Sequence, residues 1–297
     1  MGSAVITRFA PSPSGYLHLG HAFAALFAHE ATAREHGRFL LRIEDIDATR
    51  CRPEYEAAIA EDLAWLGLTW DGPVLRQSER SGAYAAAIDR LRDLDVLYPC
   101  FCTRAAIRAE IAGSASAPHG PEGPLYPGTC RAIARGEQVK RVAAGEQHAL
   151  RLDVHRAVAL VAARGGPTLT WRDRAAGVVA CAPEALGDVV LARREIGVSY
   201  HLAVTVDDAF QGVTLVTRGA DLFHATHVHR LLQAVLELPV PEYHHHRLIA
   251  GADGRRLATR DGATALRALR AAGRTAVDVR REIGWGEEPA NALPAPR

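Results

Sequence analysis

Apolar and polar stretches at the start of the chain predict a strand, a helix and a second strand. Residues 5–10 are apolar-rich and predict a short strand, and residues 11–15 (PSPSG) predict a tight loop. Residues 20–36 are rich in Ala, Leu and Phe, which favours a helix that ends at Gly37. Residues 39–43 predict a buried strand that leads into an acidic cluster. This order begins a βαβ unit, so we expect a parallel sheet.

The pattern beyond residue 50 predicts a second α/β half, separated from the first by an insertion. Apolar residues recur at helical spacing in residues 55–66 and 84–91, which predicts two amphipathic helices. Residues 112–128 are dense in Gly, Ala, Ser and Pro. Short β-like runs then occur at residues 149–154, 157–162 and 177–181. The α/β pattern resumes with strand-like runs at 202–206 and 213–217, a helix around 228–236, and a Gly/Arg-rich loop at 251–262.

Composition is that of an ordinary globular protein. Charged residues make up 23% and hydrophobic residues 48% of the 297 residues, which excludes a disordered tail, a collagen-like fibre and a coiled coil. The formal net charge is +1, so any polyanion must be bound by a local patch. Lys140 is the only lysine, and we therefore expect Arg where a basic motif commonly has Lys.

The sequence shows no targeting or membrane-spanning segment. The first 15 residues lack a basic region followed by an apolar core, and no apolar run approaches the roughly 18 residues of a membrane span. The five cysteines are odd in number, which favours reduced thiols or metal ligands over a disulfide framework. We expect a cytoplasmic, monomeric protein with no membrane partner.

The run from Arg8 to Gly15, followed by His18, Gly20 and His21, is the first candidate for chemistry. It brings a strand end to a helix N-terminus, where free N–H groups and the helix dipole favour an anion. Two histidines three residues apart can donate to phosphate oxygens there, and Gly20 lets a flat purine ring approach the backbone. A Pro/Ser turn with two surface histidines is the alternative, but it does not account for the whole run.

In these residues the sequence resembles the class I aminoacyl-tRNA synthetases, and among them the glutamyl group. RFAPSPSGYLHLGH at 8–21 is similar to the HIGH-type signature, and RIEDID at 42–47 to the acidic strand end. YHLA at 200–203, VDD at 206–208 and TRGADL at 217–222 are similar to the second half of the catalytic domain. The resemblance covers roughly residues 5–270. It implies an α/β fold with a Rossmann-type nucleotide-binding parallel sheet, interrupted by an inserted zinc-containing acceptor-binding domain and followed by a short C-terminal helical part.

The resemblance also sets the expected domain boundaries. We expect residues 1–98 and 191–247 to form the two halves of the catalytic domain. Residues 99–190 would form the inserted domain that binds zinc and the acceptor, and residues 248–297 would carry a KMSKS-like loop and the C-terminal helices. Only about 35 residues follow the Gly/Arg-rich loop, whereas full glutamyl-tRNA synthetases continue through a helical anticodon-reading region. A core without that region resembles the glutamyl-Q tRNA(Asp) synthetases. That likeness implies activation of L-glutamate by ATP with Mg²⁺, without tRNA, and transfer to the queuosine base of the tRNA(Asp) anticodon.

Glutamate binding requires basic groups for two carboxylates and an acidic group for the ammonium. Arg8 and Arg218, at strand ends, are suitable forks for carboxylates, and Glu44 is a suitable partner for the ammonium. Open α/β sheets bind ligands at strand ends, which favours this over solvated ion pairs. Which arginine takes the side-chain carboxylate stays open. The resemblance places the glutamate pocket at Arg8, Phe9, Ala10, Pro11, Ser12, Glu44, Tyr200 and Arg218.

A cysteine cluster is the second candidate for chemistry. Cys100, Cys102 and Cys130 offer three thiolates, and a closed zinc site needs a fourth ligand. His119 is the conventional chemical candidate, whereas the family resemblance points to Tyr126. Three buried thiols without metal are the alternative. A bound zinc would be structural, because the chemistry needs no open metal position.

The loop at residues 254–262 stands where the family has its KMSKS-type loop, whose lysines neutralise the triphosphate in the transition state. Arg256 stands at the first lysine and Thr259 at the second, with Arg260 beside it. We expect His18, His21, Arg256, Thr259 and Arg260 to be catalytic, and His18, Gly20, His21, Thr259 and Arg260 to bind ATP. A basic surface loop is the alternative for this segment.

Several assignments stay open at this point. Asp207 and Asp208 are interpreted equally well as a strand-end turn and as part of the site, and residues 244–246 (HHH) are placed on a strand beside the nucleotide without a metal. Three other functions compete with the one that the resemblance implies. They are glutamyl-tRNA charging with a separate anticodon-reading partner, a catalytically silent nucleic-acid-binding paralogue, which Thr259 favours, and transfer of glutamate to a small molecule or carrier protein.

Overall fold

The first half of the parallel sheet is built from the N-terminal βαβ unit. The computed structural model describes residues 4–113, 119–120, 123–165, 168–193, 197–249 and 264–286. Strands β1 (Ile6–Phe9), β2 (Arg38–Ile43) and β3 (Leu75–Arg76) pair in parallel, and α1 (Leu19–Ala33) crosses from β1 to β2. The predicted strands, the helix and the parallel pairing are confirmed.

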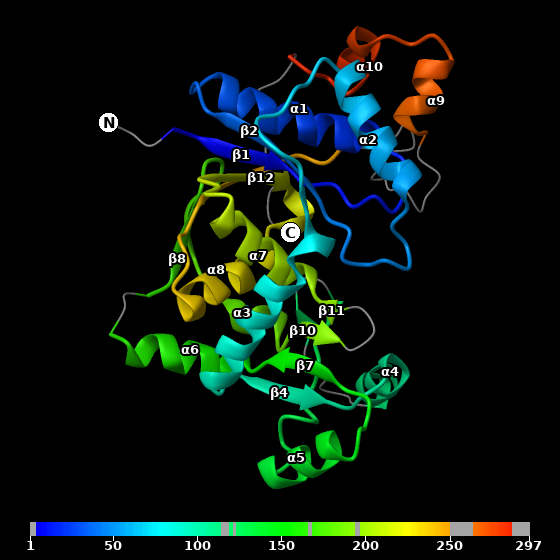
Figure 1. The fold of residues 1–297 in the computed structure, drawn as a ribbon. Helices are drawn as coiled ribbons and strands as arrows, with labels where there is room; N and C mark the ends of the chain where they lie inside the picture. Colours follow the sequence, from blue (N-terminus) through cyan, green and yellow to red (C-terminus); the bar gives the residue numbers. More distant parts are fainter. Residues whose placement is uncertain are drawn as a thin grey trace.

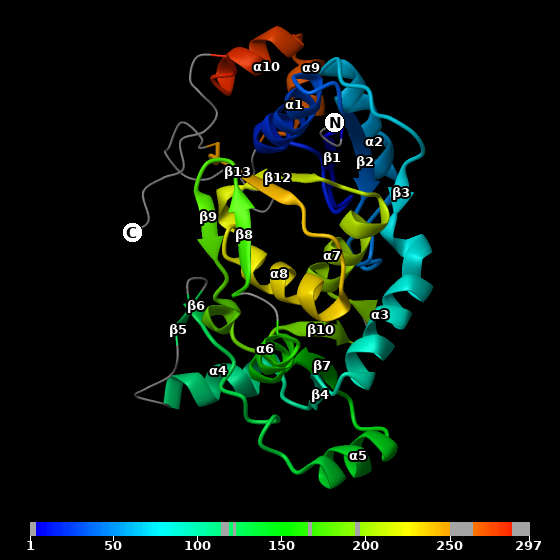
Figure 2. The same cartoon turned by 90° about the vertical axis from the view of Figure 1, so that its left-hand side faces the viewer.

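The second half of the sheet joins strands from distant parts of the chain. Strands β12 (Leu215–Gly219), β13 (Glu242–His246) and β8 (Thr170–Asp173) are parallel, and β9 (Gly177–Ala180) pairs antiparallel with β8. Figure 2 shows these four strands side by side. The backbone N–H of Thr214 donates to the carbonyl of Ile6 at 3.0 Å, which links β12 to β1. The carboxyl ends of β1 and β12 therefore lie at the same edge.

An antiparallel sheet interrupts the two halves. It consists of β11 (Gly197–Val198), β10 (Val190–Arg193), β7 (Ala149–Leu152) and β4 (Leu97–Cys100). Figure 1 shows this sheet at the end of the molecule opposite α1, with α3 running between them. Shorter elements complete the region: α4 (Arg104–Gly113), α5 (Arg135–Ala143), α6 (Val154–Ala163), η2 (Pro183–Leu186), β5 (His119–Gly120) and β6 (Gly123–Pro124). Strands β8 and β9 lie within the range 99–190 but belong to the β12–β13 sheet, and the domain boundaries themselves stay a prediction.

Helices cover the sheets and enclose two main cores. The remaining elements are α2 (Pro53–Trp65), η1 (Gln77–Arg80), α3 (Ser81–Asp93), α7 (Tyr200–Phe210), η3 (Ala220–Leu222), α8 (Ala225–Leu236), α9 (Leu266–Ala271) and α10 (Ala276–Glu282). One core is formed by residues of α1, α2, α9 and α10, and another by residues of α3, α7 and α8 with the antiparallel sheet. Burial of these apolar faces is the main stabilising contribution. No helix in the described ranges is long and apolar enough to cross a membrane.

Two strand predictions were wrong because their apolar runs are helical. Residues 157–162 lie in α6, where the Asp153 side chain caps the helix by accepting the N–H of Arg156 at 3.0 Å. Residues 202–206 lie in α7, in which Leu202 to Thr205 are all buried. Helix α7 is buried on several sides, so its sequence lacks an amphipathic period. In α6 only Val154 and Ala157 are buried, and its short run of Ala, Val and Leu has no polar side that would mark a helix. Tyr200 accordingly begins a helix and does not end a strand.

Asp62 on α2 is a buried carboxyl group facing the C-terminal helices. Neither of its carboxylate oxygens has a hydrogen-bond partner, and Arg270 Nη1 lies 3.9 Å from Oδ1. Burial raises the pKa of Asp62 to about 6, although the charge of Arg270 acts in the opposite direction. The folded protein therefore holds this proton more tightly than the unfolded chain, and ionisation of Asp62 destabilises the fold as the pH rises through about 6.

Replacing Asp62 by asparagine is expected to raise the free energy of unfolding at pH 7.5 by about 1–3 kcal/mol, since a pKa unit corresponds to about 1.4 kcal/mol. The gain should shrink as the pH falls from about 6 towards 4, close to the ordinary Asp pKa of 3.8, because the unfolded chain then begins to bind the same proton. Urea unfolding at several pH values measures it. The exposed neighbour Glu61→Gln is the control, with a change below about 1 kcal/mol. An Asp62→Asn effect that is equal at pH 7.5 and pH 4 contradicts the interpretation.

Candidate active site

The N-terminus of α1 presents two histidines in defined tautomers. His18 is the N-cap: its Nδ1 accepts the N–H of Gly20 at 3.1 Å, and His21 Nδ1 accepts the N–H of His18 at 3.2 Å. Because both Nδ1 atoms accept, both rings are neutral and carry their proton on Nε2, which is a donor. A Cβ on Gly20 would lie 3.0 Å from the His18 ring, so glycine leaves room for this cap. The helix start thus combines two N–H donors with the positive dipole end.

A second group of charges lies where β1, β2 and α7 meet. Asp208 Oδ1 is 2.9 Å from Arg8 Nε and 2.8 Å from Arg42 Nη2, and all three side chains are buried. Burial by itself raises the pKa of Asp208, but the two guanidinium charges outweigh it and lower the pKa overall. Asp208 therefore stays ionised and holds both arginines. Asp208 lies within α7, so the strand-end turn considered for it is wrong, and its part in the site stays a prediction.

Glu44 follows β2 at the edge of this cluster. Its backbone N–H donates to the carbonyl of Pro11 at 3.0 Å, and its carboxylate lies 3.5 Å from Arg42 Nη2. Burial raises the pKa of Glu44, and the charges of Arg42 and Arg8 only partly offset this. A cationic partner would favour the ionised form. The carboxylate of Glu44 can therefore bind a cationic group beside the two arginines.

Asp207 has a different role from its neighbour. It is fully buried and accepts hydrogen bonds from Gln77 at 2.9 Å, Arg80 at 2.6 Å and Tyr84 at 2.7 Å. These bonds attach η1 and α3 to α7. Asp207 is therefore a structural anchor behind the charged cluster.

Arg218 at the end of β12 is buried among neutral acceptors. Its guanidinium donates to His245 Nε2 at 3.1 Å, to His229 Nδ1 at 3.1 Å and to Thr226 Oγ1 at 2.6 Å, with Tyr200 Oη at 3.4 Å. Burial and then the charge of Arg218 lower the pKa of His229, while burial lowers that of His245 to about 4 despite its bond to Asp173. Both rings are therefore neutral, and the charge of Arg218 has no carboxylate partner in the described chain.

Four of the predicted glutamate residues converge. Arg8 Nη1 donates to the carbonyl of Thr217 at 3.2 Å, which places it beside the backbone of Arg218. Burial raises the pKa of Tyr200, while the charge of Arg218, whose Nη1 lies 3.4 Å from the hydroxyl, acts in the opposite direction. Three guanidinium groups, those of Arg8, Arg42 and Arg218, face only two carboxyl groups here. The site has a positive surplus that suits an anion.

The other predicted pocket residues are arranged less directly. Phe9 is buried in the core with α1, because neighbouring residues of a strand point to opposite faces. The carbonyl of Pro11 accepts the N–H of Glu44, and Ala10 is half-buried. Ser12 is exposed, and its Oγ lies 3.8 Å from Cys51 Sγ. Arg256, Thr259 and Arg260 lie outside the described residues. The chain re-enters the described structure beside the α1 N-terminus, where Ala265 pairs with His18.

The three cysteines of the inserted region meet. The Sγ atoms of Cys100, Cys102 and Cys130 all lie within 4.8 Å of one another, and those of Cys102 and Cys130 are 3.4 Å apart. The hydroxyl of Tyr126 is 3.5 Å from Cys100 Sγ and 3.8 Å from Cys102 Sγ. Tetrahedral zinc with Zn–S bonds of about 2.3 Å sets sulfurs ~3.8 Å apart, so this donor set fits the ion. The His119 side chain lies outside the described part.

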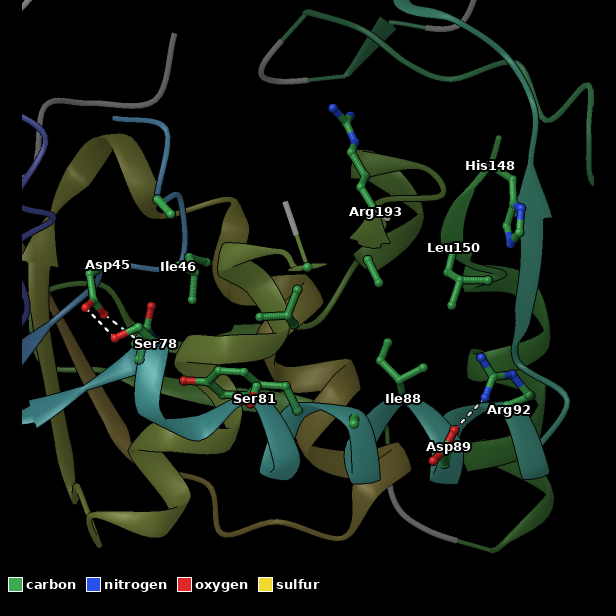
Figure 3. A pocket seen from close by; sticks show the side chains of 17 residues that line it. Asp45, Ile46, Ser78, Ser81, Ile88, Asp89, Arg92, His148, Leu150 and Arg193 are labelled. Atoms are coloured by element: carbon green, nitrogen blue, oxygen red, sulfur yellow. Dashed lines mark hydrogen bonds and ion pairs between the residues drawn. The ribbon is translucent and has the colours of Figure 1, made fainter. Parts of the chain in front are cut away.

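A cavity of about 620 Å³ lies between the charged cluster and the antiparallel sheet. Figure 3 shows Ile46, Ile88 and Leu150 around it, with Ser81 on α3 and Arg193 on β10. Gln77 and Tyr84 line it and also bond Asp207, the residue next to Asp208. The cavity thus shares a wall with the charged cluster and is mostly apolar with a few polar groups, as small-molecule sites are.

Several residues of the site carried no interpretable sequence signal. Arg42 was part of a quoted motif without a role, and His229, Thr226 and Asp173 were not singled out. Asp173 and His245 are 72 positions apart yet hydrogen-bonded at 2.7 Å. Only the pairing of β8 with β13 brings them together.

Comparison with known proteins identifies the family. Residues 4–284 match the catalytic domain of class I tRNA synthetases of the E and Q type, and the chain belongs to this family. A glutamate tRNA ligase from Elizabethkingia meningosepticum, solved with its amino acid, superposes with a TM-score of 0.70 at 29% identity, over 88% of this chain and 53% of that one. The chain thus spans about half of that enzyme.

More specific relatives narrow the assignment. A glutamyl-Q tRNA(Asp) synthetase of Rhodobacter capsulatus is 50% identical over 94% of this chain and 100% of its own length. Another, of Symbiobacterium thermophilum, is 45% identical over 90% of this chain and 81% of its own. Within the class I synthetases the chain therefore belongs with the glutamyl-Q tRNA(Asp) synthetases, as an ATP-dependent ligase.

Proposed function

We propose that this enzyme activates L-glutamate with ATP in the absence of tRNA and transfers it to the queuosine base of the tRNA(Asp) anticodon. The observation that carries the first step is the buried guanidinium of Arg218, whose hydrogen-bond partners are all neutral. An isolated buried cation is costly, and a substrate carboxylate offsets that cost. The names of the relatives support the tRNA substrate.

In the first step a glutamate carboxylate oxygen attacks the α-phosphorus of ATP and pyrophosphate leaves, giving glutamyl-adenylate. Arg8 and Arg218 bind the two carboxylates, Glu44 receives the ammonium, and Tyr200 adds its hydroxyl. His18 and His21 donate from Nε2 to phosphate oxygens at the α1 N-terminus, next to Gly20. Arg256, Thr259 and Arg260 act on the leaving pyrophosphate, and Mg²⁺ supplies charge neutralisation on the ATP phosphates.

In the second step a hydroxyl of the queuosine cyclopentene ring attacks the glutamyl carbonyl, and AMP leaves. The cavity between α3, residues 45–48 and the antiparallel sheet is the candidate site for the acceptor nucleoside. Sequence-specific proteins bind RNA through unstacked loop bases that enter pockets of this kind. The anticodon stem-loop would then lie across the inserted sheet.

The first test is glutamate-dependent ATP–pyrophosphate exchange without tRNA, run with a Thr259→Lys variant. We expect exchange with L-glutamate in the parent protein, followed by transfer of labelled glutamate to queuosine-containing tRNA(Asp) but not to tRNA(Asp) lacking queuosine. Exchange that requires tRNA(Glu) would instead indicate conventional charging with a separate anticodon-reading partner. Transfer to a small molecule or carrier without tRNA would replace the second step. If neither the parent protein nor the Thr259→Lys variant shows exchange, even with tRNA present, the result would indicate a nucleic-acid-binding role.

We also propose a structural zinc ion held by Cys100, Cys102, Cys130 and Tyr126. The three thiols and the hydroxyl form a compact set of four donors, as a closed zinc site needs. The ion would cross-link β4 to the segment that carries Tyr126 and Cys130, and so stabilise the inserted sheet. It takes no part in either chemical step.

The purified protein is expected to contain about one zinc per chain, and Cys130→Ser to lose most of it and to unfold at lower temperature, because binding and folding of such sites are coupled. Metal analysis and thermal unfolding measure both. Cys181→Ser is the matched control, since this half-buried thiol lies directly after β9 and donates to the carbonyl of His227 on α8, away from the three cysteines. Full zinc content in Tyr126→Phe would assign the fourth ligand elsewhere, with His119→Ala as the next variant. Absence of zinc after refolding with the metal contradicts the site.

A further inference from the structure

Arg218 is held by an ordered chain of hydrogen bonds. Arginine carries five N–H donors and no acceptor, so every ring nitrogen that faces it must offer a lone pair. His245 Nε2 and His229 Nδ1 do so, at 3.1 Å each. Each ring must then carry its proton on its other nitrogen, which fixes one tautomer for each histidine.

The far side of each ring has a matching acceptor. His245 Nδ1–H donates to Asp173 Oδ2 at 2.7 Å, and His229 Nε2–H donates to His201 Nδ1 at 3.1 Å. Thr226 Oγ1 lies 2.6 Å from Arg218 Nη2 and 3.2 Å from His245 Nε2. The guanidinium is thus oriented on Nε, Nη1 and Nη2 by side chains that are themselves oriented.

Asp173 is the fixed end of this chain. Its Oδ1 accepts the N–H groups of Ala175 and Ala176 at 2.8 and 2.9 Å, and its Oδ2 also accepts the N–H of His245 at 3.2 Å. Asp173 and His245 side chains are both fully buried. Because the backbone groups that face the Asp173 carboxylate are all hydrogen-bond donors, the carboxylate stays an acceptor. It is therefore compatible only with the Nδ1–H form of His245.

We propose that Asp173 and His245 are positioning residues that aim the guanidinium of Arg218 at the carboxylate of the amino-acid substrate. The inference rests on the proposed function, in which Arg218 binds glutamate. Asp173 belongs to β8, a strand between the two halves of the catalytic sheet in sequence, so this part of the chain contributes to amino-acid selection. Neither residue touches the substrate; both act through Arg218.

Asp173→Asn tests the proposal with almost no change in volume. The asparagine oxygen can still accept the N–H groups of Ala175 and Ala176, which leaves its NH₂ group facing His245 Nδ1 and removes the acceptor of the His245 backbone N–H. This favours the opposite tautomer, with Nε2–H directed at Arg218 Nε–H. In glutamate-dependent ATP–pyrophosphate exchange we expect the KM for glutamate to rise at least ~10-fold, with the KM for ATP within twofold of the parent.

Asp188→Asn is the matched control. Asp188 is also a buried carboxyl, and it accepts from Tyr98 at 2.6 Å and Arg131 at 2.9 Å in the inserted region, away from Arg218. It should lose comparable stability, yet both KM values should stay within twofold. If Asp173→Asn does not fold, Thr226→Val takes its place: it is close in shape, removes a direct acceptor of Arg218 and is expected to raise the KM for glutamate alone.

Nitrogen-15 NMR of histidine-labelled parent protein tests the chain of bonds independently of activity. We expect His245 to be neutral with its proton on Nδ1 at pH 7.5, and to change to the Nε2–H form in Asp173→Asn. A protonated or Nε2–H His245 in the parent overturns the proposal, as does a changed tautomer with an unchanged KM for glutamate. A parent without exchange activity refutes the proposed function, whereas the tautomer result still decides whether Asp173 orients His245.

Discussion

Arg218→Gln is expected to lower kcat/KM for glutamate in tRNA-free exchange by ~30- to 5,000-fold, since removing one partner of a buried hydrogen-bonded charge pair costs about 2–5 kcal/mol. The physical reason is the environment of the guanidinium. In the described chain its partners are a hydroxyl of Thr226, a hydroxyl of Tyr200 and two neutral imidazoles, so its positive charge is available to a carboxylate. Arg218→Lys is expected to recover little, because a point charge cannot replace the fork.

The same substitution separates binding from folding. Glutamine loses hydrogen bonds but also removes a buried cation that has no ion-pair partner among the described residues, so we expect the free energy of unfolding to stay within about 1 kcal/mol of the parent. Arg280→Gln is the control, because Arg280 is half-buried on α10 and donates to the carbonyl of Leu66. It should leave kcat/KM unchanged. Activity of Arg218→Gln within threefold of the parent would exclude Arg218 from the glutamate pocket.

Asp208→Asn is expected to show the second large effect, a loss of about 3–5 kcal/mol in the free energy of unfolding together with loss of exchange activity. Asp208 Oδ1 receives both Arg8 at 2.9 Å and Arg42 at 2.8 Å, and all three groups are buried. A neutral amide keeps the shape but removes the carboxylate that the two guanidinium groups share, and among the described residues only Glu44, 3.5 Å from Arg42 Nη2, remains as an ion-pair partner. Arg8 then loses the position from which, in the proposed function, it binds a glutamate carboxylate.

Chemical unfolding and exchange assays on the same preparations measure both effects. Glu282→Gln provides the contrast, because Glu282 on α10 and Arg274 form an exposed pair away from the cavity. Such surface pairs contribute little, so we expect less than about 1 kcal/mol and full activity. Stability of Asp208→Asn equal to that of the parent would mean that Arg8 and Arg42 find other counter-charges. Full exchange activity of Asp208→Asn would mean that glutamate binding does not depend on the position of Arg8.

Much of the fold was predictable where local pattern and chain order coincide. The strand–loop–helix–strand start needed only apolar spacing and the breaker residues around it, and the motif RFAPSPSGYLHLGH placed His18 and His21 at a helix start. The strands predicted at residues 157–162 and 202–206 were wrong, because both runs are helical. The helix α7 is buried on several faces, so its sequence lacks the polar side that marks an amphipathic helix.

The site was predictable only in part. Arg8, Glu44, Tyr200 and Arg218 were singled out because motifs carry them, and in the structure Arg218 lies 3.4 Å from the Tyr200 hydroxyl while Arg8 donates to the carbonyl of Thr217. The groups that orient them were not: Asp208 was left open, Arg42 had no role, and Asp173 was missed. A carboxylate that pairs with a given arginine has no signature in sequence, since any of many acidic residues can fill that position.

By itself the sequence determined which chemical groups this protein carries and their local order: a helix start with two histidines, a trio of thiols, arginines and acids at strand ends. The tertiary structure alone decided which of these groups share a charge environment. It paired Asp208 with two arginines, left Arg218 among neutral acceptors, and set Asp173 against His245 across 72 positions. The reason is physical: hydrogen bonds and charges act over a few ångströms, and strand pairing sets those distances between residues remote in the chain.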